Sequence, residues 1–296
     1  QGSGIANIDT CSAVIRLNDN GFYTLMIGAT DMGTGCDTIL AQIAAEVLHC
    51  PVSRVTVDGV DTDHSPFDKG SYASGTTYLT GMAVVKASTK LAAEIRQQGA
   101  NRLGVPVLQV MFDGEQVVSK TDPDLKISLS DLAQQLVVGD GEWLQCTATH
   151  SSPVSPPPLM AGFAEVEVDT ETGKVSVVDY VAVVDCGTVV NPNLATVQTQ
   201  GGVAQGIGMA LWEDIQYNAH GRMLNDSFMQ YKIPSRLDLP DIRVEFMPSY
   251  EPTGPFGAKS IGEIVINTPG PAIAAAVANA TGVWCSELPI KPEMLI

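Results

Sequence analysis

The sequence predicts an α/β (α+β) fold in which mixed sheets pack against helices in two lobes. Three observations support this prediction. Strand-like runs with alternating apolar residues occur in pairs, amphipathic helical segments stand between the pairs, and a Ser/Pro-rich stretch divides the chain near its middle. The 296 residues are 45% hydrophobic and include 28 Gly, which indicates a packed protein with many tight turns. We therefore expect one lobe over residues 1–150 and a second over residues 151–296.

The first lobe begins with a predicted β-hairpin. Its strands cover residues 11–17 and 22–28, on either side of a polar turn. A Gly-rich loop at residues 30–36 then leads into a helix over residues 37–49, whose apolar side chains fall on one face. A third strand is predicted at residues 55–60.

Further along the first lobe, a Ser/Thr/Gly loop at residues 71–80 opens a second amphipathic helix. Another hairpin is predicted at residues 109–118, and a short helix at residues 128–136. Because free N–H groups gather at helix N-termini, the Gly-rich and Ser/Thr-rich helix starts are candidate anion sites. Each such loop alone is weak evidence, since most of them only make turns or cap helices.

The second lobe follows the extended connection at residues 151–158. The alternating run at residues 163–169 and the returning run at residues 175–184 predict a hairpin. We expect residues 194–212 to form a helix that is buried on most sides, and residues 272–280 to form the last helix.

Composition excludes several classes of function. The formal net charge of −17, with only 16 Lys and Arg, argues against a nucleic-acid surface. No run approaches the length of a membrane span and the start lacks signal-peptide features, so we expect a cytoplasmic protein. The six cysteines form no Cys-x-x-Cys pair and the four histidines no i,i+4 pair, so no zinc or iron–sulfur site is expected from this chain.

The segment GAKSIGE, residues 257–263, presents a single carboxylate. Glu263 follows a glycine and precedes three apolar residues, so we expect its side chain at the edge of packed apolar material. Partial removal of a carboxylate from water makes it a better general base near neutral pH. The competing interpretation is a solvated loop glutamate, which is the commoner case for a lone Glu.

Several segments, in order, resemble the C-terminal half of the molybdenum-binding subunit in the xanthine dehydrogenase and aldehyde oxidase family of molybdenum hydroxylases. They extend from Gly28 to Gly282. The matching segments are GATDMGTGCDTILAQIAAEVL, GSYASGTTYLTGMAV, FAEVEVDTETGKVSVV, VDCGTVVNPNLATVQTQGGVAQGIGMALWED, YKIPS, and GAKSIGE followed by PGPAIAAAVANATG. The resemblance implies the molybdopterin-binding domain of this xanthine oxidase family and a molybdenum–molybdopterin cofactor in its cytosine dinucleotide form.

The resemblance also assigns roles to individual residues. Glu263 matches the family's catalytic glutamate, while Tyr72 and Ala73 match residues on the substrate side of the metal. No protein side chain is expected to bind the metal directly. The positions that match cofactor-contacting residues are Met32, Gly33, Thr34, Ser71, Ala73, Ser74, Thr76, Thr77 and Gln198.

Two departures from the family pattern affect these expectations. Thr34 stands where the family usually has Gln, which leaves that contact with the cofactor open. The several hundred residues that begin this subunit in the family do not precede Gly4. We therefore expect a split subunit, as in clostridial nicotinate dehydrogenases, whose N-terminal half comes from a second molybdopterin chain.

The resemblance implies hydroxylation of a nicotinate-like N-heteroaromatic substrate with oxygen from water. Electrons would pass to [2Fe–2S] clusters and FAD on partner chains. Three alternatives stay open: a purine, xanthine or aldehyde oxidising member, a reductase or carbon monoxide dehydrogenase of the same architecture, and a non-catalytic scaffold. Some members of the family carry a selenium ligand on molybdenum, and no residue of this chain indicates whether it is present.

Overall fold

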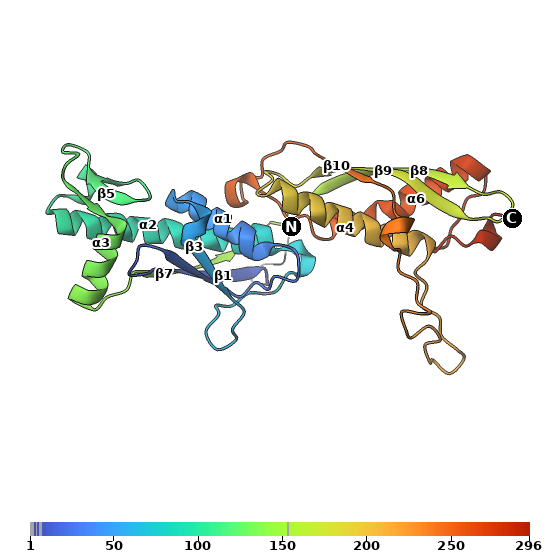
Figure 1. Ribbon diagram of the computed structural model, residues 1–296, viewed down its shortest axis with the longest axis horizontal. Helices are drawn as coiled ribbons and strands as arrows, with labels where there is room; N and C mark the ends of the chain where they lie inside the picture. The colour runs from blue at the N-terminus through green and yellow to red at the C-terminus, as the bar shows by residue number, and fades with distance from the viewer. Residues whose placement is uncertain (1–2, 4, 6–7, 153) are drawn as a thin grey trace. The chain divides into compact units, whose positions relative to one another are not determined.

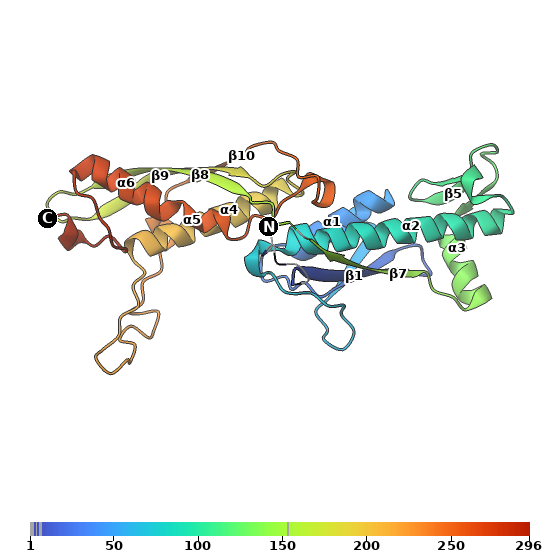
Figure 2. The same cartoon turned by 180° about the vertical axis from the view of Figure 1, so that it is seen from behind.

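The computed structural model describes residues 3, 5, 8–152 and 154–296, and Figures 1 and 2 show its ribbon from opposite sides. The chain forms two compact units. Unit 1 comprises Gln1–Pro157 with Tyr250–Ser260, and unit 2 comprises Pro158–Ser249 with Ile261–Ile296. The mixed α/β class is confirmed. The chain first passes from unit 1 to unit 2 within the Ser/Pro-rich connection, near the boundary between the predicted lobes 1–150 and 151–296. The prediction did not include the later return of Tyr250–Ser260 to unit 1.

Unit 1 is built on a four-stranded sheet with the order β3-β2-β1-β7. Strand β1 (Thr10–Leu17) pairs antiparallel with β2 (Tyr23–Ile27) and β7 (Gln145–Ser151), whereas β2 pairs parallel with β3 (Val55–Gly59). Alternate residues of β1 and β2 are buried, as period-two patterning predicts for a sheet with one covered face. The N-terminal hairpin and the third strand are confirmed.

Two helices pack against this sheet and against each other, as Figure 1 shows. Helix α1 covers Cys36–Leu48 and helix α2 covers Gly81–Leu103. Both end in a left-handed residue, His49 and Gly104, whose N–H closes the last turn. The predicted helix over residues 37–49 is confirmed. The predicted loop at residues 71–80 instead contains two short helical segments, Tyr72–Ser74 and the π-helical Thr76–Thr80, which lead directly into α2.

A smaller subdomain of unit 1 packs on the C-terminal half of α2. Its antiparallel sheet has the order β4-β5-β6 and is followed by helix α3. Gly99 allows the close approach, because a Cβ there would lie 2.6 Å from Val117. The predicted hairpin and short helix are confirmed, with Ser128 as the N-cap of α3. The bounds are Val110–Phe112 for β4, Gln116–Ser119 for β5, Lys126–Ser128 for β6 and Leu129–Gln134 for α3.

Unit 2 is a three-stranded sheet, order β10-β9-β8, with helices on one face. Strand β8 (Leu159–Val168) pairs antiparallel with β9 (Val175–Asp185), which pairs parallel with β10 (Ile242–Phe246). Helices α4 (Pro192–Leu211) and α6 (Pro269–Thr281) supply the rest of the core. The buried cluster consists of Val175, Val177, Tyr180, Ala182, Val203, Ile207, Ala210, Ile273, Val277 and Ile290. The hairpin and both helices are confirmed.

Helix α4 differs from its prediction in one respect. Val197 is 62% exposed and Met209 is 50% exposed, so one side of the helix is open and the prediction of burial on most sides is wrong there. The opposite side is tightly packed. Gly202 and Gly206 lie against Val265 and Pro269, and a Cβ at either glycine would overlap those residues. The small residues that suggested general burial therefore serve one close helix contact.

Short helical segments complete the fold. Helix α5 (Ile264–Asn267) precedes α6. The remaining short segments are Val52–Arg54, Val107–Gln109, Gln135–Asp140, Arg236–Asp238, Pro255–Gly257 and Pro292–Met294. Among the described residues, no helix has both the length and the apolar character that a membrane crossing requires.

Candidate functional site

Two candidate loops leave the unit 1 sheet at the same edge. Because β2 and β3 are parallel and pair Ile27 with Gly59, the segments that follow them start side by side. The N–H of Val60 donates to the carbonyl oxygen of Ile27 at 3.4 Å, which joins the two strand ends. A Cβ on Gly28 would overlap the carbonyl oxygen of Pro66, so the two segments also pack tightly. The carboxyl edge of parallel strands is a common position for ligand sites.

The first loop carries Met32, Gly33 and Thr34 and is braced by Asp31. The Asp31 carboxylate accepts hydrogen bonds from the backbone N–H groups of Gly33 (2.9 Å), Gly35 (3.1 Å) and Asp37 (3.4 Å). Burial opposes ionisation of Asp31, but these N–H groups together hold its pKa below the usual value. The expectation of free N–H groups at this helix start is therefore wrong for these three residues, since an acidic side chain already occupies them.

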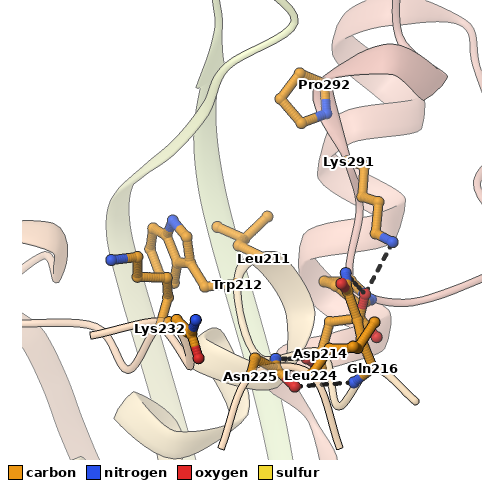
Figure 3. Close-up of a pocket in the computed structure, with 11 residues that line it drawn as sticks. Leu211, Trp212, Asp214, Gln216, Leu224, Asn225, Lys232, Lys291 and Pro292 are labelled. Atoms are coloured by element: carbon orange, nitrogen blue, oxygen red, sulfur yellow. Dashed lines mark hydrogen bonds and ion pairs between the residues drawn. The ribbon is translucent and has the colours of Figure 1, made fainter. Parts of the chain in front are cut away.

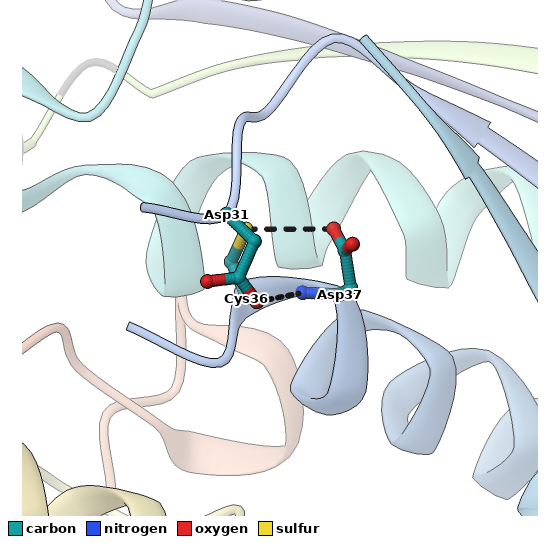
Figure 4. A group of neighbouring side chains, drawn as sticks. All are labelled: Asp31, Cys36 and Asp37. Carbon is teal, nitrogen blue, oxygen red and sulfur yellow. Dashed lines mark hydrogen bonds between the residues drawn. The ribbon is translucent and has the colours of Figure 1, made fainter. Parts of the chain in front are cut away.

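Asp31, Cys36 and Asp37 form a compact group beside this loop (Figure 4), and their potential ligand atoms lie within 4.8 Å of one another. Burial, with the nearby carboxylates, raises the pKa of the Cys36 thiol to about 12. The thiol donates to Asp37 Oδ1 at 3.7 Å, so the group is explained by its own hydrogen bonds.

The tip of the first loop is open. Met32 is 67% exposed, and Gly33 and Thr34 are also exposed. Gly33 has φ +100°, and the position of a Cβ there has no neighbouring heavy atom within 4 Å. The loop thus presents a braced backbone that is open at Gly33, an arrangement that allows another group to approach closely.

The second loop carries Ser71, Tyr72, Ala73, Ser74, Thr76 and Thr77. Ala73 and Ser74 both have φ of 51°, which is unfavourable for residues with a Cβ. Ser74 is buried and Tyr72 is about half exposed. The Thr76 hydroxyl donates to Ser71 Oγ at 2.9 Å, which ties the two ends of this loop together. Strained backbone of this kind concentrates at functional sites.

Sequence reasoning missed the residues that hold this second loop. Asp68 accepts from the Gly70 N–H at 2.8 Å and from the Thr80 hydroxyl at 2.7 Å, so one carboxylate spans the loop. Lys69, the next residue, is buried against Asp9. A charged Asp-Lys pair directly before a Ser/Thr/Gly loop was the signal available in the sequence.

The other two candidates, Gln198 and Glu263, belong to unit 2. Gln198 is partly buried on α4, one turn before Gly202. Glu263 immediately precedes α5, two residues before the Val265 side chain that packs against Gly202. The two candidates therefore lie on α4 and at the N-terminal end of α5, two helices that contact each other. Glu263 itself is exposed, so its expected partial burial is wrong for this chain. Val265 supplies the buried contact of this segment instead.

A separate pocket of about 510 Å³ opens in unit 2 at the C-terminal end of α4 (Figure 3). Trp212 and Leu211 form an apolar part of its wall. Lys291 and Asp214 also line it and form an ion pair, with 2.9 Å between Lys291 Nζ and Asp214 Oδ2. None of the residues predicted for cofactor, substrate or catalysis lines it. The pocket is distinct in its lining from the candidate site.

Comparison with known proteins gives a consistent match. A family model described as a molybdopterin cofactor-binding domain matches residues 1–240. The chain is 40% identical over 298 residues to the probable hypoxanthine oxidase XdhD of Escherichia coli K12, covering 100% of this chain and 31% of XdhD. It is 33% identical to the putative xanthine dehydrogenase molybdenum-binding subunit XdhA of that organism, covering 97% of this chain and 39% of XdhA.

Among solved structures, quinoline 2-oxidoreductase from Pseudomonas putida 86 superimposes with a TM-score of 0.87 at 29% identity. The match covers 96% of this chain and 37% of that one. The chain therefore spans about a third of the length of the relatives that it matches.

Proposed function

The chain belongs to the xanthine oxidase family as a molybdopterin cofactor-binding part of the molybdenum subunit, and from this premise we propose a hydroxylase that acts on an N-heteroaromatic substrate. The observation that carries the proposal is the pair of braced loops at one edge of the unit 1 sheet. Their family match and the open tip of the first loop support a role in holding the cofactor.

The residues present fit a pterin cofactor. The Gly33 backbone has open space beside it, and Gly70, with φ +93°, has the same feature at the start of the second loop. Hydroxyl and amide side chains suit the polar edges of a pterin and its phosphates. The residues that would hold the group are Met32, Gly33, Thr34, Ser71, Ala73, Ser74, Thr76, Thr77 and Gln198. When bound, the molybdenum cofactor supplies the two-electron oxidation.

Glu263 is the proposed general base. Its carboxylate oxygen would accept the proton of the water-derived oxygen nucleophile, a role that positioned Glu side chains serve in many enzymes. Its exposure in this chain leaves it reachable by substrate. The desolvation that strengthens such a base would come from parts of the enzyme that these residues do not include.

Tyr72 and Ala73 are the proposed substrate-side residues. Tyr72 offers an exposed aromatic ring, and aromatic rings favour stacked or edge-on packing with a heteroaromatic substrate. Ala73 leaves room beside it because its side chain is small. The proposed substrate is nicotinate-like, and the name of quinoline 2-oxidoreductase supports the same chemical class, an N-heteroaromatic ring.

The second candidate function is oxidation of a purine. The 40% identity to a probable hypoxanthine oxidase favours it, and a purine is also a flat N-heterocycle. We further propose the cytosine dinucleotide form of the cofactor, [2Fe–2S] and FAD partner chains, and a cytoplasmic location. The designation of one relative as the gamma subunit of a dehydrogenase complex supports the idea of partner chains.

Turnover assays on the purified complex test this function. Nicotinate, quinoline, hypoxanthine, xanthine, an aldehyde and carbon monoxide would be supplied with an artificial electron acceptor, and product oxygen would be traced with ¹⁸O-water. We expect turnover of an N-heterocycle with label from water. Turnover of only the aldehyde or carbon monoxide would contradict the proposed substrate class, and no turnover of any of them would favour the scaffold alternative.

A further inference from the structure

Lys69 and Asp9 form a buried ion pair next to the second loop of unit 1. Lys69 Nζ lies 2.8 Å from Asp9 Oδ1, and the two side chains are 3% and 0% exposed. Lysine and aspartate are seldom buried this completely. Since desolvation offsets most of the attraction within such a pair, net stability is a weak reason for its presence. The presence of the pair is better explained by the groups of the second loop that it holds in place.

The Lys69 ammonium also contacts Tyr72 in two ways. It donates a hydrogen bond to the Tyr72 carbonyl oxygen at 3.3 Å, and it lies 3.9 Å from the centroid of the Tyr72 ring. A cation over an aromatic face is attracted by the ring's negative face. A single buried charge thus fixes both the backbone and the side chain of Tyr72.

The anchor of this arrangement is part of the sheet framework. Asp9 immediately precedes β1, and its carbonyl oxygen accepts a hydrogen bond from the Ser152 N–H, just after β7. Its carboxylate also accepts from the Ser3 hydroxyl at 2.9 Å. Lys69 therefore connects the loop to the ends of two paired strands.

The backbone after Tyr72 needs such support. Ala73 and Ser74 occupy left-handed conformations, which persist only where the surrounding structure holds them. Gly75 then passes so close to the lysine that a Cβ there would lie 2.8 Å from Lys69 Cε. The lysine side chain thus contacts the loop before and after the two strained residues.

We propose that Lys69, anchored by Asp9, is a positioning residue that sets the shape of loop 71–77 for the pterin cofactor and the substrate. The inference rests on the proposed function of this loop. Lys69 acts through Tyr72 and the strained backbone, and its own ammonium is already engaged by Asp9 and Tyr72.

Variants in the complete complex test this role. Lys69→Met removes the charge, and the double variant Asp9→Asn/Lys69→Met removes the charge on both sides. Lys69→Arg keeps the charge but changes its reach. Lys126→Met is the matched control, because it makes the same charge change at an exposed position of strand β6. Each complex would be analysed for pterin and molybdenum per chain, thermal midpoint, KM and kcat.

We expect Lys69→Met to lower the thermal midpoint and to reduce pterin content or raise KM at least tenfold. The double variant should recover the thermal midpoint, because no unpaired charge is left buried, without recovering pterin content or KM. Lys69→Arg should recover part of the thermal midpoint and part of the pterin content or KM. Lys126→Met should match the wild type.

Recovery of pterin content and KM in the double variant would overturn the inference, because the pair would then serve only to neutralise itself. Wild-type values in Lys69→Met would overturn it as well. If Lys69→Met does not fold, the double variant decides. A wild-type complex without pterin would instead contradict the proposed function, so the two failures are distinguishable.

Discussion

The loops of unit 1 and the Glu263 segment of unit 2 are built in opposite ways. In unit 1, Asp31 and Asp68 engage loop N–H and hydroxyl groups, so the loops are held by their own unit. In unit 2, Glu263 is exposed two residues before the buried Val265. The loops proposed to hold the cofactor are held by hydrogen bonds within unit 1, whereas the proposed base lies at an exposed position of unit 2.

Replacing the proposed base should have the largest effect. Glu263→Gln keeps the size of the side chain and removes its basicity, so kcat should fall by roughly 10² to 10⁴. Molybdenum content should stay at the wild-type level, because the loops of unit 1 are unchanged. Steady-state assays and metal analysis check both expectations. Glu167→Gln, an exposed change on β8, is the matched control and should leave kcat unaltered. Unchanged turnover in Glu263→Gln would remove this residue from the mechanism.

The packing that supports the Glu263 segment can be tested separately. Gly202→Ala would place a Cβ against Val265 and should destabilise unit 2 by about 1 to 3 kcal/mol, the usual cost of overpacking. Its neighbour Gly201 has no atom near the Cβ position, so Gly201→Ala should stabilise by about 0.5 to 1 kcal/mol through helix propensity. Urea unfolding measures both. Equal effects at the two glycines would show that α5 does not pack as closely as described.

The brace of the first loop has a pH signature. Since the folded-state pKa of Asp31 lies below its unfolded value of about 3.9, the stabilisation is present above that value and is lost as pH falls through the folded pKa. Asp31→Asn keeps an acceptor oxygen and removes the charge, so it should cost about 0.3 to 1 kcal/mol at neutral pH, the usual contribution of a negative charge near a helix N-terminus. The difference from the wild type should shrink in acid. A pH-independent difference in unfolding free energy would mean that the charge of Asp31 is not what braces the loop.

The smallest effect is expected at a surface ion pair of unit 2. Arg243 and Asp179 pair across β10 and β9, but the arginine is largely exposed. Exposed pairs contribute little, so Asp179→Asn should change the unfolding free energy by about 0.5 kcal/mol or less, and by less still in high salt. Unfolding curves at two salt concentrations test this. A loss above about 2 kcal/mol would place this pair among the structurally important contacts of unit 2.

Local pattern predicted the hairpins and the main helices of both units, but the strands β6, β7 and β10 were not predicted. The hairpins at β1–β2 and β8–β9 and the helices α1 and α6 follow from period and turn residues within a few positions of the chain. The parallel pairing of β2 with β3 brings the two loops to the same edge of the unit 1 sheet. This pairing depends on tertiary packing, which the hydrophobic pattern of a short segment does not predict.

The missed features involve residues that are far apart in the chain. The Lys69 and Asp9 pair joins positions 60 residues apart. The Tyr78 N–H donates to the Ser260 hydroxyl at 3.1 Å across 182 residues, which accompanies the return of Tyr250–Ser260 to unit 1. The exposure of Glu263 was also missed. Apolar neighbours in sequence predict a buried segment, but they do not determine which of its residues points inward.

The most direct test of the account is the molybdenum and pterin content of the purified complex, measured per copy of this chain. We expect about one molybdenum and one pterin for each copy, with the peptides covering residues 30–35 and 71–77 protected from hydrogen exchange when the cofactor is bound. A complex that contains neither molybdenum nor pterin, or one whose cofactor leaves both loops unprotected, would contradict the claim that these loops hold it.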